Sequence, residues 1–385
     1  MKILIICYEY PPIGGGGGIA VKNYAEEWAK KNKVIVLTSN YKNLKKKEVL
    51  NGVEINRIPA LGKKDRATAT LVSMLSYIVF GSFYFIKNIK KLKKINIVNT
   101  HFSIPSGPLG IIIAKLLGKP DVLTIIGGDI YDPTKKFSPH RNIVMRTINK
   151  LIINSATKIV SISNDTKKRA QKYYKIKKEI KVINCGFVPV KIPNIKRGRL
   201  NLSETKYYLI SIGRLIPRKG FKYLIVSLNY LPNNINLIII GDGPLKSRLK
   251  NYVKKRRGLK KRVIFTGFLD SESKYSYLKN ADCYVLPSLH EGLGIVLQEA
   301  MYTGLPIVAT NNGGQNDLIK ETRNGFLVPP KQPKILARAI KKIYSNPKIA
   351  TEMKNNNLKD IKKLYISSNS KIYLNMFERL IQKNG

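Results

Sequence analysis

Short apolar runs alternate with longer amphipathic stretches along the whole chain, and this alternation restricts the fold more than any other feature. Candidate strands in the first half span 2–7, 34–38, 95–100, 122–126, 158–163 and 181–184. Candidate strands in the second half span 207–212, 236–240, 263–266, 283–287 and 306–310. Strands that alternate with helices are typical of parallel sheets covered by helices on both faces. The sequence therefore predicts an α/β protein.

The segment 189–198 lies between the two sets of strands and contains Pro189, Pro193 and Gly198. This composition is typical of a linker. The chain has 385 residues, enough for two or three domains of about 150 residues each. We therefore expect two doubly wound, Rossmann-like domains facing a central cleft, with ligands at the carboxyl ends of the strands.

The chain is strongly basic, with 70 Lys and Arg against 23 Asp and Glu and a net charge of +47. Such an excess favours an anionic partner, either nucleic acid or anionic lipid, although a Lys-rich composition alone also explains it. The sequence has no helix-turn-helix signature, RNA-binding motif or zinc-ligand spacing. We therefore predict no nucleic-acid partner.

The cysteines and the N-terminus indicate the compartment. Cys7, Cys185 and Cys283 lie far apart, which argues against a disulfide framework or a metal site and fits a reducing compartment. The apolar run at 3–7 is too short for a signal peptide. These features predict a cytoplasmic protein.

The stretch 67–86 has twenty residues without a charge and lies between Arg66 and Lys87. Its length is that of a helix that spans a bilayer. An uncharged helix of this kind also suits the membrane interface, or the interior of a domain. The sequence leaves these three alternatives open.

The segment from Pro287 to Gly304 carries the strongest chemical signal. A strand ends at Pro287, a loop with Gly292 and Gly294 follows, and a helix runs to Gly304. Glycines at a helix N-terminus let backbone N–H groups approach an anion. Glu299 lies about 7 to 8 Å along that helix at 1.5 Å per residue, roughly the distance from a bound diphosphate to its ribose. The alternative to a ligand site is that the glutamate near the helix N-terminus only interacts favourably with the helix dipole and that Glu299, within the helix, is only solvated.

Two further loops follow strands of the same half. Arg214 and Lys219 flank the turn after the strand 207–212, and two cations there can neutralise a diphosphate leaving group without a metal ion. Gly241 and Gly243 form the turn after the strand 236–240. The three loops together predict a diphosphate site at one edge of the second sheet.

These motifs resemble those of family 4 glycosyltransferases (glycosyl transferases group 1), which are retaining, nucleotide-sugar-dependent enzymes with the GT-B fold. The resemblance covers nearly the whole chain. Glu291 and Glu299 match the E-x7-E motif of the family. Three other family motifs match: G-R-x4-K-G at Gly213-Arg214 and Lys219-Gly220, G-D-G-P at 241–244, and P-P-x-x-G-G at Pro11-Pro12 and Gly17-Gly18.

The resemblance implies a role for each matched residue. Arg214 and Lys219 would bind the diphosphate, Glu299 the ribose and Glu291 the donor sugar. The catalytic set would be Glu291, Arg214, Lys219 and His101. The remaining donor-binding residues would be Gly17, Gly18, Gly213, Gly241, Gly243, Gly292, Leu293, Gly294 and Ile295, with Glu299.

The activity implied is the transfer of a hexosyl unit, with retention, from a nucleoside diphosphate sugar to a glycan or lipid-linked acceptor, with no metal and no cofactor. Residues 1–190 would bind the acceptor, with a C-terminal helix at about 370–385 packing back on them, and residues 191–369 would bind the nucleotide sugar. We expect the enzyme to be peripheral on the inner face of the cell membrane. A non-catalytic nucleotide-sugar-binding protein and an epimerase of the same fold are the alternatives.

The acceptor side departs from the family pattern. Ile126 occupies a position where the family usually has a histidine. His101, after the strand 95–100, matches another frequent family histidine and is expected to position the acceptor, although an ordinary strand-end histidine is the alternative. The glycine run 14–18 predicts a mobile loop that closes over the donor phosphate or the acceptor. Leu293 replaces the common Phe between Gly292 and Gly294.

Overall fold

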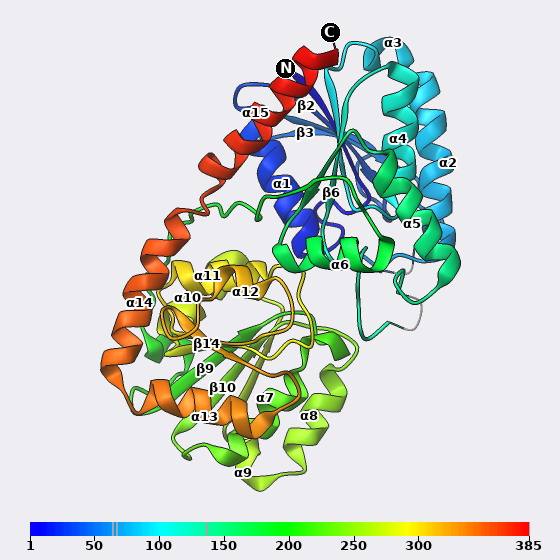
Figure 1. Ribbon diagram of the computed structural model, residues 1–385. Helices are drawn as coiled ribbons and strands as arrows, with labels where there is room; N and C mark the ends of the chain where they lie inside the picture. The colour runs from blue at the N-terminus through cyan, green and yellow to red at the C-terminus, as the bar shows by residue number, and fades with distance from the viewer. Residues whose placement is uncertain (64, 67, 136–137, 385) are drawn as a thin grey trace. The chain divides into compact units, whose positions relative to one another are not determined.

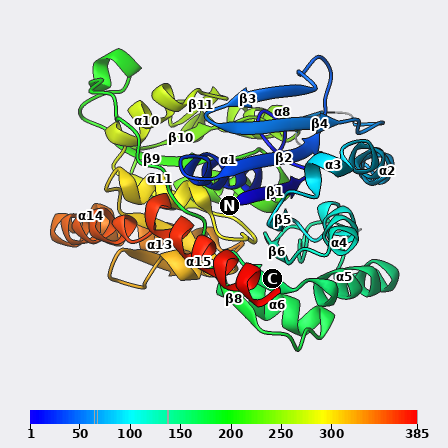
Figure 2. The same ribbon diagram turned by 90° about the horizontal axis from the view of Figure 1, so that it is seen from above.

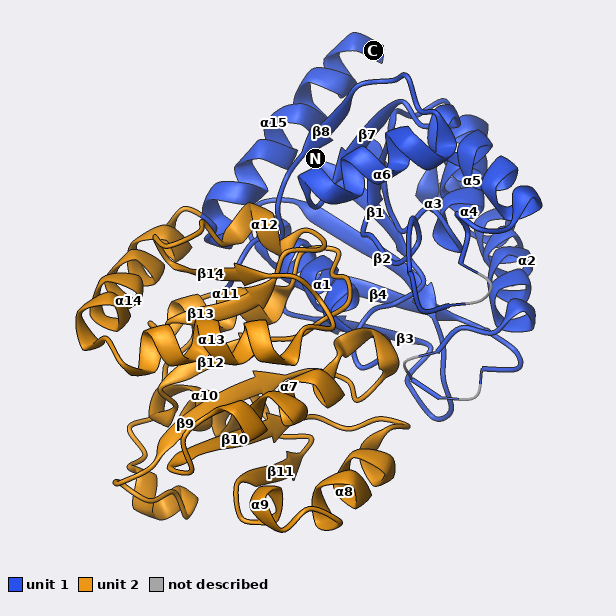
Figure 3. Cartoon of the chain, turned by 60° about the horizontal axis from the view of Figure 1, so that its bottom comes forward, with its two compact units in different colours: residues 1–188, 364–385 blue, residues 189–363 orange. Residues whose placement is uncertain are grey.

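The computed structural model describes residues 1–63, 65–66, 68–135 and 138–384. The chain divides into two compact units, shown in different colours in Figure 3. The first unit comprises Met1–Val188 and Leu364–Gly385, and the second comprises Pro189–Lys363. The C-terminal helix α15 (Ile366–Asn384) is part of the first unit, and the second unit ends at Lys363 instead of near 369.

The first unit is built on an eight-stranded sheet with the order β3-β4-β2-β1-β5-β6-β7-β8. All neighbouring strands are parallel except the edge pair β3 and β4. The sheet's strand order reverses between β1 and β5, where Cys7 pairs in register with His101. The strands are β1 (Lys2–Cys7), β2 (Lys33–Ser39), β3 (Lys47–Leu50), β4 (Val53–Ile58), β5 (Ile97–His101), β6 (Asp121–Ile125), β7 (Lys158–Ser161) and β8 (Ile180–Val182).

Helices cover both faces of this sheet, as Figures 1 and 2 show. Successive residues of a strand point to opposite faces, so Ile3 and Ile5 pack with Trp28 of α1 (Gly16–Ala29) and with α15. Leu4 and Ile6 pack on the opposite face, with Tyr77. The helices of that side and of the β6–β8 end are α2 (Leu71–Lys87), α3 (Ile89–Leu92), α4 (Ser106–Leu117), α5 (Ile143–Ser155) and α6 (Asn164–Tyr174).

The uncharged stretch predicted at 67–86 forms α2, apart from Ala67, which lies outside the described residues. Thr70 caps the helix and exchanges hydrogen bonds with Ser73, an arrangement that fixes its first turn. One face of α2, including Tyr77, Gly81 and Phe85, is buried against the sheet, and the opposite face is exposed. Among the described helices, none is long and apolar enough to cross a membrane.

The second unit has a parallel six-stranded sheet with the order β11-β10-β9-β12-β13-β14. Its strands are β9 (Tyr207–Ile212), β10 (Ile235–Ile240), β11 (Val263–Gly267), β12 (Cys283–Leu286), β13 (Ile307–Thr310) and β14 (Gly325–Val328). The helices are α7 (Phe221–Ser227), α8 (Lys246–Lys254), α9 (Arg257–Lys260), α10 (Ser271–Asn280), α11 (Ile295–Tyr302), α12 (Gln315–Leu318), α13 (Pro333–Tyr344) and α14 (Pro347–Lys362). The strand order reverses between β9 and β12, so a ligand site is expected at their carboxyl ends.

Glycines let the loops after β9, β10 and β12 approach one another through their backbones. A Cβ on Gly220 (φ +65°) would lie 2.0 Å from the carbonyl oxygen of Pro287. A Cβ on Gly241 (φ +139°) would lie 2.1 Å from the carbonyl oxygen of Gly213. No side chain fits at either position, so the three loops meet at one edge of the sheet only because these residues are glycines.

We predict that Gly241→Ala lowers the free energy of unfolding by at least about 2 kcal/mol, because the Cβ would displace the loop after β9. Gly258→Ala is the matched control, since nothing lies within 4 Å of its Cβ and it lies in the short helix α9. Urea unfolding followed by circular dichroism measures both. Equal stabilities of the two variants would contradict the close approach of the loops.

Candidate active site

Glu291 is the most enclosed charged residue of the second unit's carboxyl edge. It follows β12 by five residues, and its backbone bridges to Gly313 and accepts a hydrogen bond from the backbone N–H of Gly314 (2.9 Å). Its carboxylate accepts hydrogen bonds from Nζ of Lys219 (2.5 Å) and Oγ of Ser288 (2.6 Å). A short loop therefore holds the acid rigidly at the end of the sheet.

Two cations of the β9 loop face this carboxylate. Lys219 pairs with Oε1, and Nη1 of Arg218 lies 3.7 Å from Oε2. Burial alone raises the pKa of Glu291, but Lys219, Arg218 and the two hydrogen bonds outweigh it and lower the pKa to about 2. Glu291 is therefore ionised at neutral pH and cannot act as a general acid in this state.

The N-terminus of α11 lies in the same loop. Gly294 caps this helix with φ +90° and has no side chain that could accept a hydrogen bond from its first turn. The first backbone N–H groups of a helix have no intrahelical partner and carry partial positive charge. This end of α11 is therefore suited to an anion, as predicted for Gly292–Ile295, where Leu293 is buried.

Glu299 lies one turn further along α11. Its Oε1 accepts a hydrogen bond from Nζ of Lys274 in α10 (2.7 Å), whereas its Oε2 is buried and has no partner. A buried carboxylate oxygen without a partner is costly, and a ligand hydroxyl would satisfy it. The position therefore fits the predicted contact with a ribose.

The loops after β9 and β10 complete this edge of the second unit. Arg214 is exposed and directly follows Gly213, whose N–H donates to the carbonyl oxygen of Ile240 (3.0 Å). The N–H of Leu215 donates to the carbonyl oxygen of Asp242 (2.9 Å), which ties the turn of Gly241 and Gly243 to the β9 loop. The predicted residues of the second unit thus belong to the loops at one edge of one sheet and to the first turns of α11, which follows one of these loops.

The predicted residues of the first unit lie at its own switch point, after β1 and β5. The glycine run is only partly a loop, because Gly16, Gly17 and Gly18 form the first turn of α1. A Cβ on Gly17 would lie 2.7 Å from Cζ of Phe102, and one on Gly18 would lie 2.9 Å from the carbonyl oxygen of Glu9. The prediction of a mobile loop over the whole run is therefore wrong: close packing explains two of its glycines.

His101 ends β5 and is only 2% exposed. Its Nε2 is hydrogen-bonded to Oδ1 of Asn99 (2.6 Å), and its Nδ1 is buried without a partner. Burial lowers the pKa of His101 to about 3, so the ring is neutral at physiological pH. In this conformation the imidazole is enclosed in the domain, and its expected contact with the acceptor stays a prediction.

Ile126, at the position of the missing histidine, contributes its backbone instead of a side-chain nitrogen. Its N–H and that of Gly127 donate to Oδ1 of Asp129, and the backbone N–H of Ser103 donates to Oδ2 (2.7 Å). The buried Asp129 therefore joins the loops after β5 and β6. It has a structural role that its place in the sequence does not reveal.

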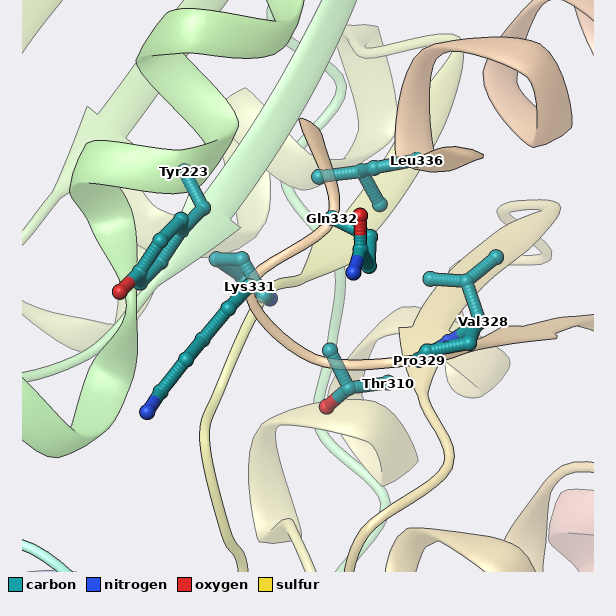
Figure 4. Close-up of a pocket in the computed structure, with 8 residues that line it drawn as sticks. Tyr223, Thr310, Val328, Pro329, Lys331, Gln332 and Leu336 are labelled. Atoms are coloured by element: carbon teal, nitrogen blue, oxygen red, sulfur yellow. The ribbon is translucent and has the colours of Figure 1, made fainter. Parts of the chain in front are cut away.

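Sequence reasoning missed three residues that contact the candidate site. Ser288 and Arg218 contact Glu291. The only sequence feature that could have indicated them is their position in or beside the predicted loops. Lys274 contacts Glu299 from a helix 25 positions away, and no motif marks it. Figure 4 shows a small cavity lined by Tyr223, Thr310 and Lys331, among others. Its volume of about 10 Å³ holds roughly one water molecule, so it is no substrate site.

Comparison with known proteins identifies the family of the chain. The family model of Glycosyltransferase Family 4 matches residues 14–189, and that of Glycosyl transferases group 1 matches residues 194–360. An uncharacterized glycosyltransferase of Methanocaldococcus jannaschii is 26% identical over 416 aligned positions, which cover 100% of both chains. The UDP-Gal:alpha-D-GlcNAc-diphosphoundecaprenol alpha-1,3-galactosyltransferase of Escherichia coli is 32% identical over 251 positions, or 62% of this chain and 63% of the relative.

Among solved structures, a sucrose-phosphate synthase from Thermosynechococcus elongatus superposes with a TM-score of 0.86 at 21% identity, covering 100% of both chains. This likeness shows the fold, which is GT-B. The fold and the site define a glycosyltransferase of the nucleotide-sugar type. The chain belongs to glycosyltransferase family 4, and it is a transferase and not an epimerase.

The burial of His101 predicts a pH-dependent stability of the first unit. The unfolded histidine has a pKa of about 6.5, and the folded one about 3, so between these values only the unfolded chain binds the proton. Stability therefore falls as the pH drops through this window. Between pH 7 and pH 5, His101 should account for a decrease of about 2 kcal/mol in the free energy of unfolding, and His101→Gln should abolish this decrease.

Urea unfolding at both pH values measures this effect through Trp28, the single tryptophan, which is buried in the first unit. The substitution also removes the hydrogen bond to Asn99. The effect of that bond on stability cancels when the loss of stability between pH 7 and pH 5 is compared between the wild type and the variant. Equal losses would contradict a neutral, buried imidazole.

Proposed function

We propose that the protein transfers a hexosyl unit from a nucleoside diphosphate sugar to a lipid-linked or saccharide acceptor, with retention of configuration and without a metal ion or other cofactor. The observation that carries this proposal is the Glu291 and Glu299 pair, held on either side of the α11 N-terminus. The second unit binds the donor in this proposal, and the first unit receives the acceptor.

Each part of the donor has a chemical partner in this scheme. The diphosphate meets the α11 N-terminus, Arg214 and Lys219, and these positive groups stabilise the charge that develops as the glycosidic bond breaks. The partnerless Oε2 of Glu299 accepts a hydrogen bond from a ribose hydroxyl. Glu291, ionised beside Lys219, orients a hydroxyl of the donor sugar and favours positive charge at its anomeric carbon.

Nucleotide release from the donor tests the role of the cations. Arg214→Ala should lower the rate of nucleoside diphosphate release by about 100-fold or more, the usual scale for the loss of one partner of transition-state charge. Lys219→Ala should lower the rate as strongly, but it also leaves the buried Glu291 with a weaker set of partners and destabilises the unit. Arg214, which is exposed, gives the cleaner variant.

The matched control is Arg257→Ala, because Arg257 is also exposed but begins α9, which precedes β11 and so lies at the amino edge of the sheet. This variant should keep the full rate. If Arg214→Ala and Arg257→Ala release nucleotide equally fast, Arg214 does not act on the diphosphate.

We also propose that the enzyme is cytoplasmic and peripheral on the inner face of the cell membrane, where it meets an acceptor carried by a lipid. The E. coli relative is named for a diphosphoundecaprenol acceptor. In the first unit, α2 packs against α4 and α4 against α5, side by side in Figures 1 and 2. The three helices expose large apolar side chains, each 52–68% accessible: Leu71, Val72, Leu75, Val79, Phe83, Ile86, Leu116, Ile143, Val144 and Leu151.

We call these side chains the apolar helix face. Exposed basic residues in or directly after these helices include Lys87, Lys90 of the short helix α3, Lys115 and Lys150. Apolar surface combined with basic side chains suits the interface of an anionic bilayer, where each properly placed cation contributes about 1 kcal/mol. Lys91 is not part of this set, because it pairs with Glu54.

Vesicle binding tests this attachment. The protein should sediment with phosphatidylglycerol vesicles at low salt and be partly released at high salt, because the screening length falls from about 10 Å at 0.1 M to about 3 Å at 1 M. Replacing Leu75, Val79 and Phe83 by Ser should weaken binding at every salt concentration. The control is the replacement by Ser of Ile372 and Leu358, which are exposed apolar residues outside these helices. This variant should bind the vesicles as the wild type does. Unchanged sedimentation of the triple variant would contradict the apolar helix face.

A further inference from the structure

A pocket opens at the carboxyl edge of the first sheet, between the loops that follow β2 and β4. Its volume is about 330 Å³, at the lower end of the range for small-molecule sites. Loop residues of both strands line it: Asn40, Tyr41, Lys42, Pro59, Ala60, Leu61, Gly62 and Lys63. All of these lining residues belong to the first unit, and the sequence motifs do not mark the pocket.

The two charged residues that line this pocket are both lysines. Lys42 is exposed and makes no ion pair with the described carboxylates. It adopts φ +51°, a left-handed conformation that is strained for a residue with a Cβ. Such strain is typical of functional loops. Lys42 is therefore a cation without an anionic partner at the rim of the pocket, and its backbone conformation is unfavourable.

Lys63 lies deeper, with Nζ 4.3 Å from the centre of the Tyr8 ring. Burial lowers the pKa of Lys63, and the charges of Glu9 and Asp65 oppose this shift. Its ammonium group is partly desolvated, so a bound anion would interact with it more strongly than with a fully hydrated lysine. The pair of lysines favours an anionic group of the size of a phosphate or diphosphate.

One wall of the pocket is also the beginning of the apolar helix face. The N–H of Leu61 donates to Oγ of Ser76 in α2 (2.8 Å), and Oγ1 of Thr70 donates to the carbonyl oxygen of Gly62 (3.0 Å). The side chain of Val72 lies directly against Gly62. Leu61 itself is 55% exposed, so an apolar surface continues from the pocket wall onto α2.

We infer that this pocket binds the phosphate ester of a lipid, with Lys42 and Lys63 on the phosphate and the hydrocarbon chain on Leu61, Val72 and the rest of the apolar helix face. A free phosphate would use the lysines alone and gain nothing from the adjoining apolar surface. That this lipid is the acceptor rests on the proposed function; the binding site itself does not.

Calorimetric titration of the full chain with decyl phosphate, inorganic phosphate and decyl glucoside tests this inference. Decyl phosphate should bind at least about 10-fold more tightly than either of the others, because it alone engages both surfaces. Lys42→Gln should weaken the binding of decyl phosphate, and it carries little risk to folding because Lys42 is exposed. The double variant Lys42→Gln with Lys63→Gln should weaken this binding further. Neither variant should change the binding of decyl glucoside.

Val72→Ser provides the complementary test, since it should weaken both decyl compounds and leave inorganic phosphate unchanged. The matched charge control is Lys31→Gln with Lys168→Gln, two exposed lysines outside the pocket, which should bind decyl phosphate as the wild type does. Wild-type affinity in the double pocket variant would overturn the lysine site. Equal affinity for decyl phosphate and inorganic phosphate would overturn the inference that the ligand is a lipid.

The outcome also separates this inference from the proposed reaction. If decyl phosphate fails to bind while a nucleotide sugar still raises the melting temperature, the pocket assignment is wrong and the transferase scheme is untouched. If decyl phosphate binds and no nucleotide sugar does, the pocket assignment holds and the reaction scheme is wrong.

Discussion

The close approach of Gly220 to the carbonyl of Pro287 is the constraint on which the candidate donor site depends. Lys219 precedes that glycine, and Glu291 follows that proline by four residues, so the backbone contact brings the two charges within 2.5 Å. Gly241 and Gly213 make the equivalent contact between the loops after β9 and β10. The motif glycines are thus required by packing, and the charged residues between them are positioned as a result.

Much of this second unit could be predicted because its signals are local. A strand followed by Gly-Arg or by Glu-Gly-Leu-Gly defines both the end of the sheet and the chemistry placed there. The strand β14 was missed because it is only four residues long, Gly325–Val328, and its pattern is weak. Lys274 could not be found at all, since its contact with Glu299 depends on how α10 packs beside α11.

The first unit was less predictable, for two physical reasons. β3 and β4 carry charged residues such as Glu48, Glu54 and Arg57, which pair with one another or with nearby lysines and so obscure the apolar pattern. The glycine run suggested flexibility, whereas Gly17 and Gly18 are needed for close packing at the start of α1. The exposed apolar side chains of α4 and α5 also look like ordinary core positions until their burial is known.

The central claim is that the second unit binds a nucleoside diphosphate sugar, and thermal unfolding of the full chain with UDP-, GDP- and ADP-glucose tests it most directly. A ligand at 100 times its Kd stabilises the folded state by about 2.7 kcal/mol. The account predicts that at least one of these compounds raises the melting temperature and that Glu299→Gln reduces the shift. No shift with any nucleotide sugar would contradict it.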